Sequence, residues 1–308
     1  MEYTTLGKTG LKVSRMGLGG IPVQRVGPAE AKALIDAVEA AGVNYIDTAR
    51  GYTVSEELLG QALEGRREKF ILATKAMAWD RDSMVQAVET SLKNLRTDHI
   101  DLYQIHNPSL QQLEQVCAPG GALEALMEAK AAGKVRHLGI TAHLQEVFRK
   151  ALELDWVETV MFPYNIVESQ GTELMERARE KNIGFINMKS LAGGAIEDAR
   201  LALRFAASNP NVTVVLPGMY TPEEVAENAA AVADAWGTAS SAGAATVPPA
   251  RRGSAYHPPF YFTATSAAMG WRTGPKAAIR PCLPRPGTVW NAEPARSGAP
   301  TVCRSGRC

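Results

Sequence analysis

Short apolar runs alternate with amphipathic stretches along the first 236 residues. Eight of the runs predict strands, and they are RMGLGG, NYIDT, KFILATK, IDLYQIH, VRHLGIT, TVMFPYN, IGFINMK and TVVLPGM. Each is followed by a predicted helix, such as AEAKALIDAVEAAG after the first run, with apolar residues at the i, i+3, i+4 and i+7 positions of one buried face. The repeated strand–helix–strand order indicates parallel pairing.

Eight such units predict a closed barrel. A doubly wound sheet would be favoured by a GxGxxG fingerprint after the first strand, and the sequence has none there. Eight strand–helix units within about 225 residues are typical of the (β/α)8 TIM barrel. We therefore expect an α/β fold, a (β/α)8 TIM barrel over residues 1–236, with a short N-terminal β-hairpin around YTTLGKTGLKVS and an irregular C-terminal tail.

The periodic pattern ends near residue 237, where the composition also changes. Residues 237–308 hold eight Arg, one Lys, one Glu and ten of the 18 Pro, which leaves 24 basic and 31 acidic residues in 1–236. No helical or strand period survives in stretches such as TVPPARRGSAYHPPF. We therefore expect a tail that is mainly disordered.

Two further hypotheses apply to this tail. Its enrichment in Arg, Pro, Ala, Gly and Ser, with a single acidic residue, is also what a GC-rich gene yields when it is translated out of frame. A basic segment that binds nucleic acid is the other hypothesis. The arginines are scattered, however, and no recognisable nucleic-acid module accompanies them, so we expect no nucleic-acid partner.

Overall composition narrows the class of protein. The 308 residues are 45% hydrophobic and 21% charged with a formal net charge of +1, as in a soluble α/β domain with a substantial core. No apolar run reaches the ~18 residues that span a bilayer, and MEYTTLGKTG lacks the pattern of a secretory signal, so we expect a cytoplasmic protein without a membrane partner. The four cysteines include no CxxC pair, so neither a metal site nor a disulfide framework is indicated.

Three ionisable residues stand where successive predicted strands end. Asp47 ends the second strand, Lys75 the third and His106 the fourth, and Tyr52 lies in the loop after the second. The carboxyl ends of barrel strands meet at one rim, where the catalytic residues of this fold lie. Each residue alone has a structural explanation, as a turn residue, a surface charge, a packing aromatic or a satisfied polar group. Together they favour function, because charge at a barrel mouth is costly unless it is paired or used.

These residue types suit proton donation to a carbonyl oxygen. The pKa of a free tyrosine is near ~10, so Tyr52 is a weak acid unless a cation such as Lys75 stabilises its phenolate. Asp47 would pair with Lys75 and hold it in place, and His106 would donate a hydrogen bond to a substrate oxygen. No side chain supplies hydride, so a reductase of this design requires a nicotinamide cofactor.

The segments DTARGYTVSEELLG, ILATK and DLYQIHNP, in this order and spacing, resemble the aldo-keto reductase superfamily. The resemblance covers residues 3 to about 235 and implies a catalytic tetrad of Asp47, Tyr52, Lys75 and His106. It also implies an oxidoreductase that uses NADPH or NADH to reduce a small-molecule carbonyl substrate. The segments FPYNIVESQG and MKSLAGGA resemble a bacterial branch that often carries a C-terminal iron–sulfur extension, whose cysteine cluster is absent here.

The resemblance further implies a set of cofactor contacts. They are Gly19 and Gly20 at the nicotinamide, Thr141 and Asn165 at its carboxamide, Met188 against its ring, Ser190, Leu191 and Gly193 at the pyrophosphate, and Gly218, Glu227 and Asn228 at the adenosine end. Backbone N–H groups of the SLAGG loop would receive the pyrophosphate. Met188 stands where many members have a Tyr, and a buried core methionine is its alternative interpretation.

The adenosine end bears on the choice between NADPH and NADH. Many members bind the 2′-phosphate with a Lys and an Arg, and the resemblance puts Gly218 and Glu224 at those two positions. Glu224 would repel a phosphate dianion, so we expect more tolerance of NADH than is usual, unless Lys189 or another loop cation compensates.

Other interpretations of the barrel stay open. A metal-dependent hydrolase would need more His and Asp ligands at the rim and would leave Tyr52 unexplained. A cofactor-binding regulatory subunit with little turnover, like the barrel subunits of potassium channels, is a second alternative. A product of a shifted gene with an impaired substrate cap is a third. We expect Trp79 and the loop NPSLQQLEQVCAPGG to line the mouth, but the sequence specifies neither the substrate nor a partner protein.

Overall fold

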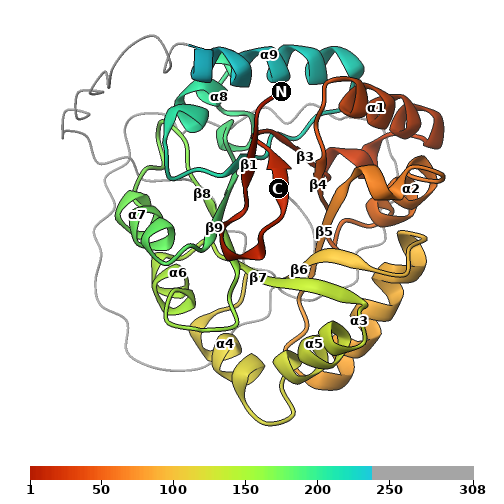
Figure 1. The fold of residues 1–308 in the computed structure, drawn as a ribbon, viewed down its shortest axis with the longest axis vertical. Coiled ribbons are helices and arrows are strands. Elements are labelled where there is room, and N and C mark those ends of the chain that lie inside the picture. The colour runs from red at the N-terminus through yellow and green to blue at the C-terminus, as the bar shows by residue number, and fades with distance from the viewer. Residues whose placement is uncertain (238–308) are drawn as a thin grey trace, which may run out of the picture. The chain divides into compact units, whose positions relative to one another are not determined.

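Eight parallel strands pair side by side in the computed structural model, which describes residues 1–237 (Figure 1). The strands are β3 (Gly17–Gly19), β4 (Tyr45–Asp47), β5 (Ile71–Ala76), β6 (Ile100–His106), β7 (Val135–Thr141), β8 (Thr159–Pro163), β9 (Gly184–Met188) and β10 (Val214–Val215). They pair in sequence order, and bridges from Met16 to Val215 and from Gly19 to Gly218 join β3 to β10. The predicted (β/α)8 barrel is confirmed. The predicted tail, beyond its first residue, lies outside the described residues.

Helices surround the strands, as Figure 1 shows. They are α1 (Pro28–Ala40), α2 (Ser55–Ala62), α3 (Arg81–Asn94), α4 (Leu110–Cys117), α5 (Ala122–Ala131), α6 (Gln145–Ala151), α7 (Thr172–Glu180), α8 (Ala199–Ser208) and α9 (Pro222–Gly237). The expectation of a loop in NPSLQQLEQVCAPGG was wrong. The segment contains α4, because Ser109 and Gln112 form a capping box that starts a helix there.

Side chains of each strand alternate between the barrel interior and the surrounding helices, as the period of two requires. One buried cluster contains Tyr45, Ala73 and Leu102, together with Met161, Ile186 and Val214 from the opposite strands. Their neighbours Ile46, Leu72 and Tyr103 belong to a second cluster that includes the apolar faces of the helices. The interior cluster fills the barrel below the level of Asp47, Lys75 and His106.

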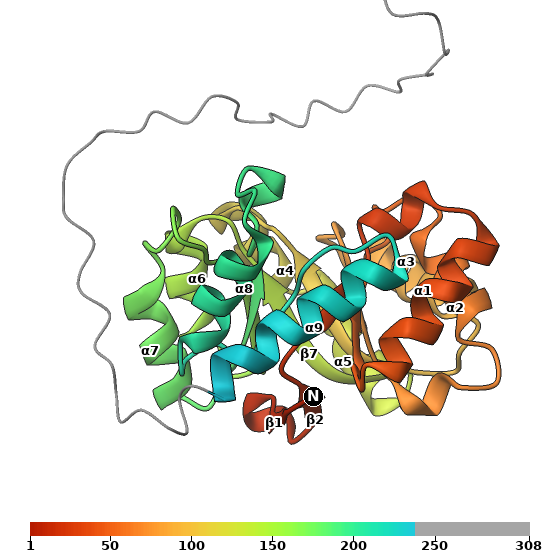
Figure 2. The same ribbon diagram turned by 90° about the horizontal axis from the view of Figure 1, so that it is seen from above.

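A hairpin closes the end of the barrel at which the strands begin. Strands β1 (Tyr3–Thr5) and β2 (Lys12–Ser14) are antiparallel, as predicted, and Figure 2 shows them on one side of the barrel. The chain between them forms a short 3-10 turn, Gly7–Thr9. Leu6 and Val13 from this hairpin pack into the interior cluster. The hairpin therefore leaves the other end, where the strands finish, as the open one.

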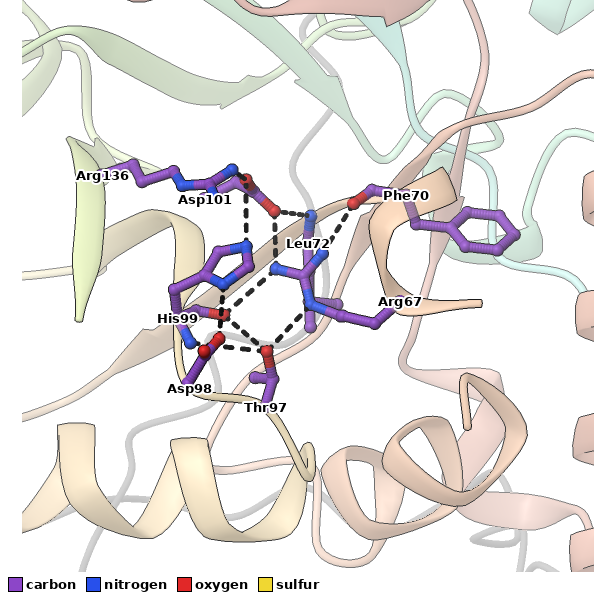
Figure 3. A network of polar contacts seen from close by, with 8 residues as sticks. All are labelled: Arg67, Phe70, Leu72, Thr97, Asp98, His99, Asp101 and Arg136. Carbon is purple, nitrogen blue, oxygen red and sulfur yellow. Dashed lines mark hydrogen bonds and ion pairs between the residues drawn. The ribbon is translucent and has the colours of Figure 1, made fainter. Parts of the chain in front are cut away.

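A polar network lies at the same end as the hairpin, near the first residues of β5, β6 and β7 (Figure 3). Its centre is Asp101, which accepts hydrogen bonds from Arg67 Nη2 at 2.7 Å, Arg136 Nη1 at 2.9 Å and the Leu72 amide at 2.9 Å. The guanidinium of Arg67 also donates to the carbonyls of Phe70 and His99. The network ties three strands together at the closed end.

Candidate active site

The four residues of the expected tetrad converge at the open end of the barrel. Asp47 is the last residue of β4, Lys75 the fifth of six in β5, and His106 the last of β6. All three occupy inward positions of their strands, two residues beyond Tyr45, Ala73 and Gln104 respectively. The strand period and parallel pairing therefore bring these side chains to one place, as the sequence predicted.

Asp47 and Lys75 form a buried ion pair, and each is only 2% exposed. Lys75 Nζ also donates to the Thr48 carbonyl at 2.8 Å, and Gln104 Nε2 donates to Asp47 Oδ2 at 3.0 Å. Burial acts to lower the pKa of Lys75, but Asp47 and Tyr52 together raise it above its usual value. Lys75 is therefore a cation whose position is fixed by Asp47, Thr48 and Tyr52.

Gln104 is a site residue that the sequence argument missed. It lies on the inward side of β6, its side chain is fully buried, and its Oε1 atom has no hydrogen-bond partner in residues 1–237. The available signal was a polar residue inside the apolar run IDLYQIH, at the same inward period as His106. Its contact with Asp47 was not visible along the chain.

Tyr52 lies beside both Lys75 and His106. Lys75 Nζ is 5.0 Å from the centre of the Tyr52 ring, and the His106 ring lies 6.0 Å away in an edge-on arrangement. Burial raises the pKa of Tyr52 above its usual value, while Lys75 acts in the opposite direction. Lys75 thus has the predicted influence, but burial outweighs it. The phenol consequently keeps its proton at neutral pH, as a proton donor requires.

His106 is neutral over the physiological range. Burial, followed by the nearby cation Lys75 and the His143 imidazole, lowers its pKa to about 3. Its Nδ1 atom is buried and has no hydrogen-bond partner among residues 1–237. A neutral imidazole can donate one hydrogen bond from a ring nitrogen, which fits the expected role toward a substrate oxygen.

The glycines expected at the nicotinamide serve a structural purpose in this chain. A Cβ atom on Gly20 would lie 2.6 Å from the Asp47 carbonyl oxygen, and one on Gly19 would lie 2.9 Å from that of Pro217. Both glycines therefore allow β3 to approach its neighbours. Their contact with a nicotinamide stays a prediction.

Thr141 and Asn165, the residues expected at the carboxamide, differ in how many of their side-chain hydrogen bonds are already made within the protein. Thr141 is buried, and its hydroxyl accepts a hydrogen bond from the Asn107 amide at 2.9 Å. Asn165 donates to Glu168 and to the Lys189 carbonyl, and its oxygen accepts from the Val167 and Glu168 amides. Thr141 still has its hydroxyl proton to donate, whereas Asn165 would have to release bonds to serve a ligand.

Met188 ends β9 at the level of the tetrad. Its side chain is half-buried and packs against the interior cluster. This contact accounts for it as a core residue. Stacking on a nicotinamide ring stays a prediction.

The loop after β9 has the geometry of an anion site. Lys189, Ala192, Gly193 and Gly194 all have positive φ angles. The amides of Ser190 and Leu191 donate to no acceptor within residues 1–237. Adjacent free N–H groups are what a phosphate oxygen requires, so this loop fits the pyrophosphate of a dinucleotide.

Asn187, which the sequence argument also missed, binds the first part of this loop through its side chain. It is fully buried in β9, donates to the Tyr164 carbonyl at 2.7 Å and accepts from the Ser190 hydroxyl at 2.9 Å. The contact fixes where the loop leaves the strand. A polar residue in the apolar run IGFINMK was the only sign of it in the sequence.

Gly218, just before α9, and Glu224, in its first turn, are the two positions at which many relatives bind the 2′-phosphate. A Cβ on Gly218 would lie 2.8 Å from Pro22 Cγ, so this position has no room for a lysine. Glu224 Oε2 accepts a hydrogen bond from the Tyr220 amide at 2.6 Å, so the carboxylate is turned onto its own loop. Asn228 is buried and Glu227 exposed, so they lie on different sides of α9, and their contact with adenine stays a prediction.

In residues 1–237 no group of three or more His, Cys, Asp or Glu side chains is arranged to hold a metal ion. In the same residues no helix has the length and apolar character needed to cross a membrane.

Comparisons with known proteins agree with this fold. A model of the Aldo/keto reductase family matches residues 15–200. The chain is 35% identical over 220 residues to Aldo-keto reductase YhdN of Bacillus subtilis, and the match covers 64% of each protein, just under two thirds. It is 28% identical over 285 residues to L-galactose dehydrogenase of Arabidopsis thaliana, covering 76% of this chain and 89% of that one. The holo form of aldo-keto reductase AKR11C1 from Bacillus halodurans has a TM-score of 0.68 at 25% identity, covering 75% and 91% of the two chains.

Proposed function

Because this chain belongs to the aldo/keto reductase family, we propose that it reduces an aldehyde or ketone to an alcohol with NADPH or NADH, with Tyr52 as general acid. The supporting observation is the environment of Tyr52, a half-buried phenol beside a fixed cation, Lys75, and a neutral imidazole, His106. We further propose that it acts in the cytoplasm on a small molecule, without a membrane or nucleic-acid partner.

Each polar group has a defined part in this reaction. The nicotinamide cofactor supplies hydride, which no side chain can provide. Tyr52 gives its proton to the substrate oxygen, and Lys75 stabilises the phenolate that remains. Asp47 holds Lys75 within reach of Tyr52. His106 donates a hydrogen bond to the same substrate oxygen.

The cofactor would lie across the open end of the barrel. The amides of Ser190 and Leu191 would bind its pyrophosphate, and the Thr141 hydroxyl would contact the carboxamide. The loop is accessible, because a Cβ on Gly193 or Gly194 would meet nothing within 4 Å. These residues fit a dinucleotide at the rim.

The decisive experiment follows cofactor oxidation by absorbance, with NADPH and NADH against a panel of aldehydes, ketones and quinones. Sugar carbonyls belong in the panel because one relative is named for L-galactose. Saturable turnover with at least one carbonyl class is the expected result. Tight cofactor binding without turnover on any class would instead support the regulatory barrel.

Cofactor choice has its own test at α9. Glu224→Arg should raise the preference for NADPH over NADH by about tenfold, because a charge-assisted hydrogen bond contributes roughly 1.5 kcal/mol or more. Glu223→Arg, a change of the same charge at the neighbouring exposed position, is the matched control. Equal effects of both variants would mean that only net charge matters. No effect of either would place the 2′-phosphate elsewhere.

A further inference from the structure

A second buried carboxylate lies next to the strand that carries Lys75, because it accepts a hydrogen bond from the preceding residue, Thr74. Glu56, in the first turn of α2, is fully buried. Its partners are Arg50 in an ion pair, Asn94 Nδ2 at 3.3 Å, Thr74 Oγ1 at 2.8 Å and Ser91 Oγ at 2.7 Å. The carboxylate thus joins the loop after β4, strand β5 and helix α3. The proposed reaction uses none of these groups.

Arg50 and Glu56 stand on either side of Tyr52 in the chain. The Arg50 amide donates to the Lys75 carbonyl at 2.9 Å, so the residue is attached to β5 by its backbone and to α2 by its side chain. Thr74, which accounts for one of the bonds to Glu56, directly precedes Lys75. The pair therefore connects the loop that carries the phenol to the strand that carries the cation.

The loop between these anchors is short and constrained. Thr48 and Ser55 hydroxyls are 2.9 Å apart, and the Tyr52 amide donates to the Ala49 carbonyl at 3.0 Å. Thr53, next to Tyr52, has a φ of 40°, a left-handed conformation that a β-branched residue rarely adopts. A conformation of this kind persists only when its surroundings hold it. The Arg50–Glu56 pair is the charged part of those surroundings.

We propose that Arg50 is a positioning residue, which holds the Tyr52 loop through its ion pair with Glu56 so that the phenol stays beside Lys75. The kinetic part of this inference rests on the proposed reductase function. A buried carboxylate needs its partners to remain stable, so the pair resists the loop movements that would separate Tyr52 from Lys75. Arg50 itself is 28% exposed in its side chain, so a substitution there can be accommodated better than one at Glu56.

The kinetic test compares Arg50→Met, which keeps an apolar stem, with Arg50→Lys, which keeps the charge. Arg50→Met should lower kcat by about tenfold or more, because a displacement near 1 Å can cost up to 10²-fold, while the cofactor Kd stays unchanged. Arg50→Lys should recover most of the rate. Arg136→Met is the matched control, since it breaks an Arg–Asp pair at the closed end and should leave kcat unchanged.

A spectroscopic test does not depend on turnover. Three charged or titratable groups face Tyr52, namely Lys75 from β5, Asp47 from β4 and His106 from β6. Moving the phenol away from Lys75 weakens the attraction that lowers its pKa. Ultraviolet tyrosinate titration, with the Tyr52→Phe protein subtracted, should show a shifted pKa for Tyr52 in Arg50→Met, upward where the loss of Lys75 dominates and downward where the loss of burial dominates, and no change in Arg136→Met.

The outcomes separate this inference from the proposed function. If the native protein turns over no carbonyl but Arg50→Met shifts the titration, positioning stands and the reductase proposal fails. If Arg50→Met matches Arg136→Met in both kcat and titration, Arg50 is only structural and the inference is overturned. Should Arg50→Met not fold, Arg50→Gln removes the charge of the ion pair and keeps a hydrogen-bond donor for Glu56. It should show the same titration shift at smaller size, and an unchanged titration there would also overturn the inference.

Discussion

Asp47 and Asp101 both bind groups of strand β5, from the neighbouring strands β4 and β6. Asp47 contacts Lys75 near the end of β5, and Asp101 contacts Leu72 near its beginning. Both are buried, at 2% and 3% exposure, and both pair with cations. At Asp101, every guanidinium nitrogen of Arg67 donates to an acceptor within the network of Figure 3. At Asp47, the cation Lys75 faces the phenol of Tyr52, and next to it a buried nitrogen of His106 has no partner in the described chain.

The contrast shows how similar groups come to serve stability or chemistry. The Arg67 guanidinium, whose three nitrogens all have acceptors, has no capacity left for a ligand, although His99 Nε2 in the same network has no hydrogen-bond partner among the described residues. Lys75 is different, because it is paired with Asp47 and also faces the phenol of Tyr52, so it can act on an added molecule through that phenol. The same division is known for this fold, in which the ends where strands finish carry catalysis and the opposite ends carry stability.

The strongest test of the open end is Tyr52→Phe. This change removes the proton donor and keeps the ring, so kcat should fall by roughly 100-fold or more while cofactor affinity and Tm stay near native values. Steady-state cofactor oxidation and fluorescence titration of the cofactor measure the two quantities. An unchanged kcat would sink the assignment of Tyr52 as the acid.

The matching test of the closed end is Asp101→Asn. Loss of this carboxylate leaves Arg67 and Arg136 without their shared partner, so the free energy of unfolding should fall by about 3 kcal/mol. Urea denaturation measures it, and kcat of the folded enzyme should remain native. If kcat fell as far as in Tyr52→Phe, the two ends would not be separable.

Lys75→Met sharpens the comparison through pH. Lys75 lowers the pKa of Tyr52 against the effect of burial, so its removal should raise that pKa further. Because Tyr52 can donate a proton only while it is protonated, the alkaline limb of the pH profile of kcat should move to higher pH. The maximum kcat of the variant should also be lower than that of the native protein. Arg67→Met, a loss of charge at the closed end, should leave the limb in place. An identical limb in both variants would show that Lys75 does not act on Tyr52.

A smaller effect is expected at His106. Its pKa in the folded protein is about 3, below the ordinary value of 6.5, so the unfolded chain binds more protons between these two pH values. Stability is then present above pH 6.5 and is lost as pH falls toward about 3. His106→Gln should therefore show a smaller drop in Tm between pH 7 and pH 4 than the native protein, by thermal melts. A drop of equal size would mean that His106 is not buried in the neutral form.

The smallest effect should come from ending the chain after residue 238. Both carboxylate sites and the loop after β9 lie before that point. The shortened protein should therefore bind cofactor and melt within a few degrees of the full chain. Thermal melts with and without NADPH measure this, and an insoluble product would show that residues beyond 238 belong to the core.

Local pattern by itself determined the strands, the barrel and the approximate place of the tetrad. The runs NYIDT, KFILATK and IDLYQIH carry the period of two that puts Asp47, Lys75 and His106 on inward positions at strand ends. Parallel pairing then brings those ends together without further information. These features depend on residues that are close in sequence, so they are visible before folding.

Only the tertiary structure decided which polar groups meet. Glu56 joins Arg50 to Ser91 and Thr74, Gln104 reaches Asp47 across the interior, and Pro22 fills the space beside Gly218. The raised pKa of Tyr52 likewise follows from burial by segments distant in the chain. Hydrogen bonds and desolvation depend on atoms within a few ångströms in space, and sequence separation does not record that distance.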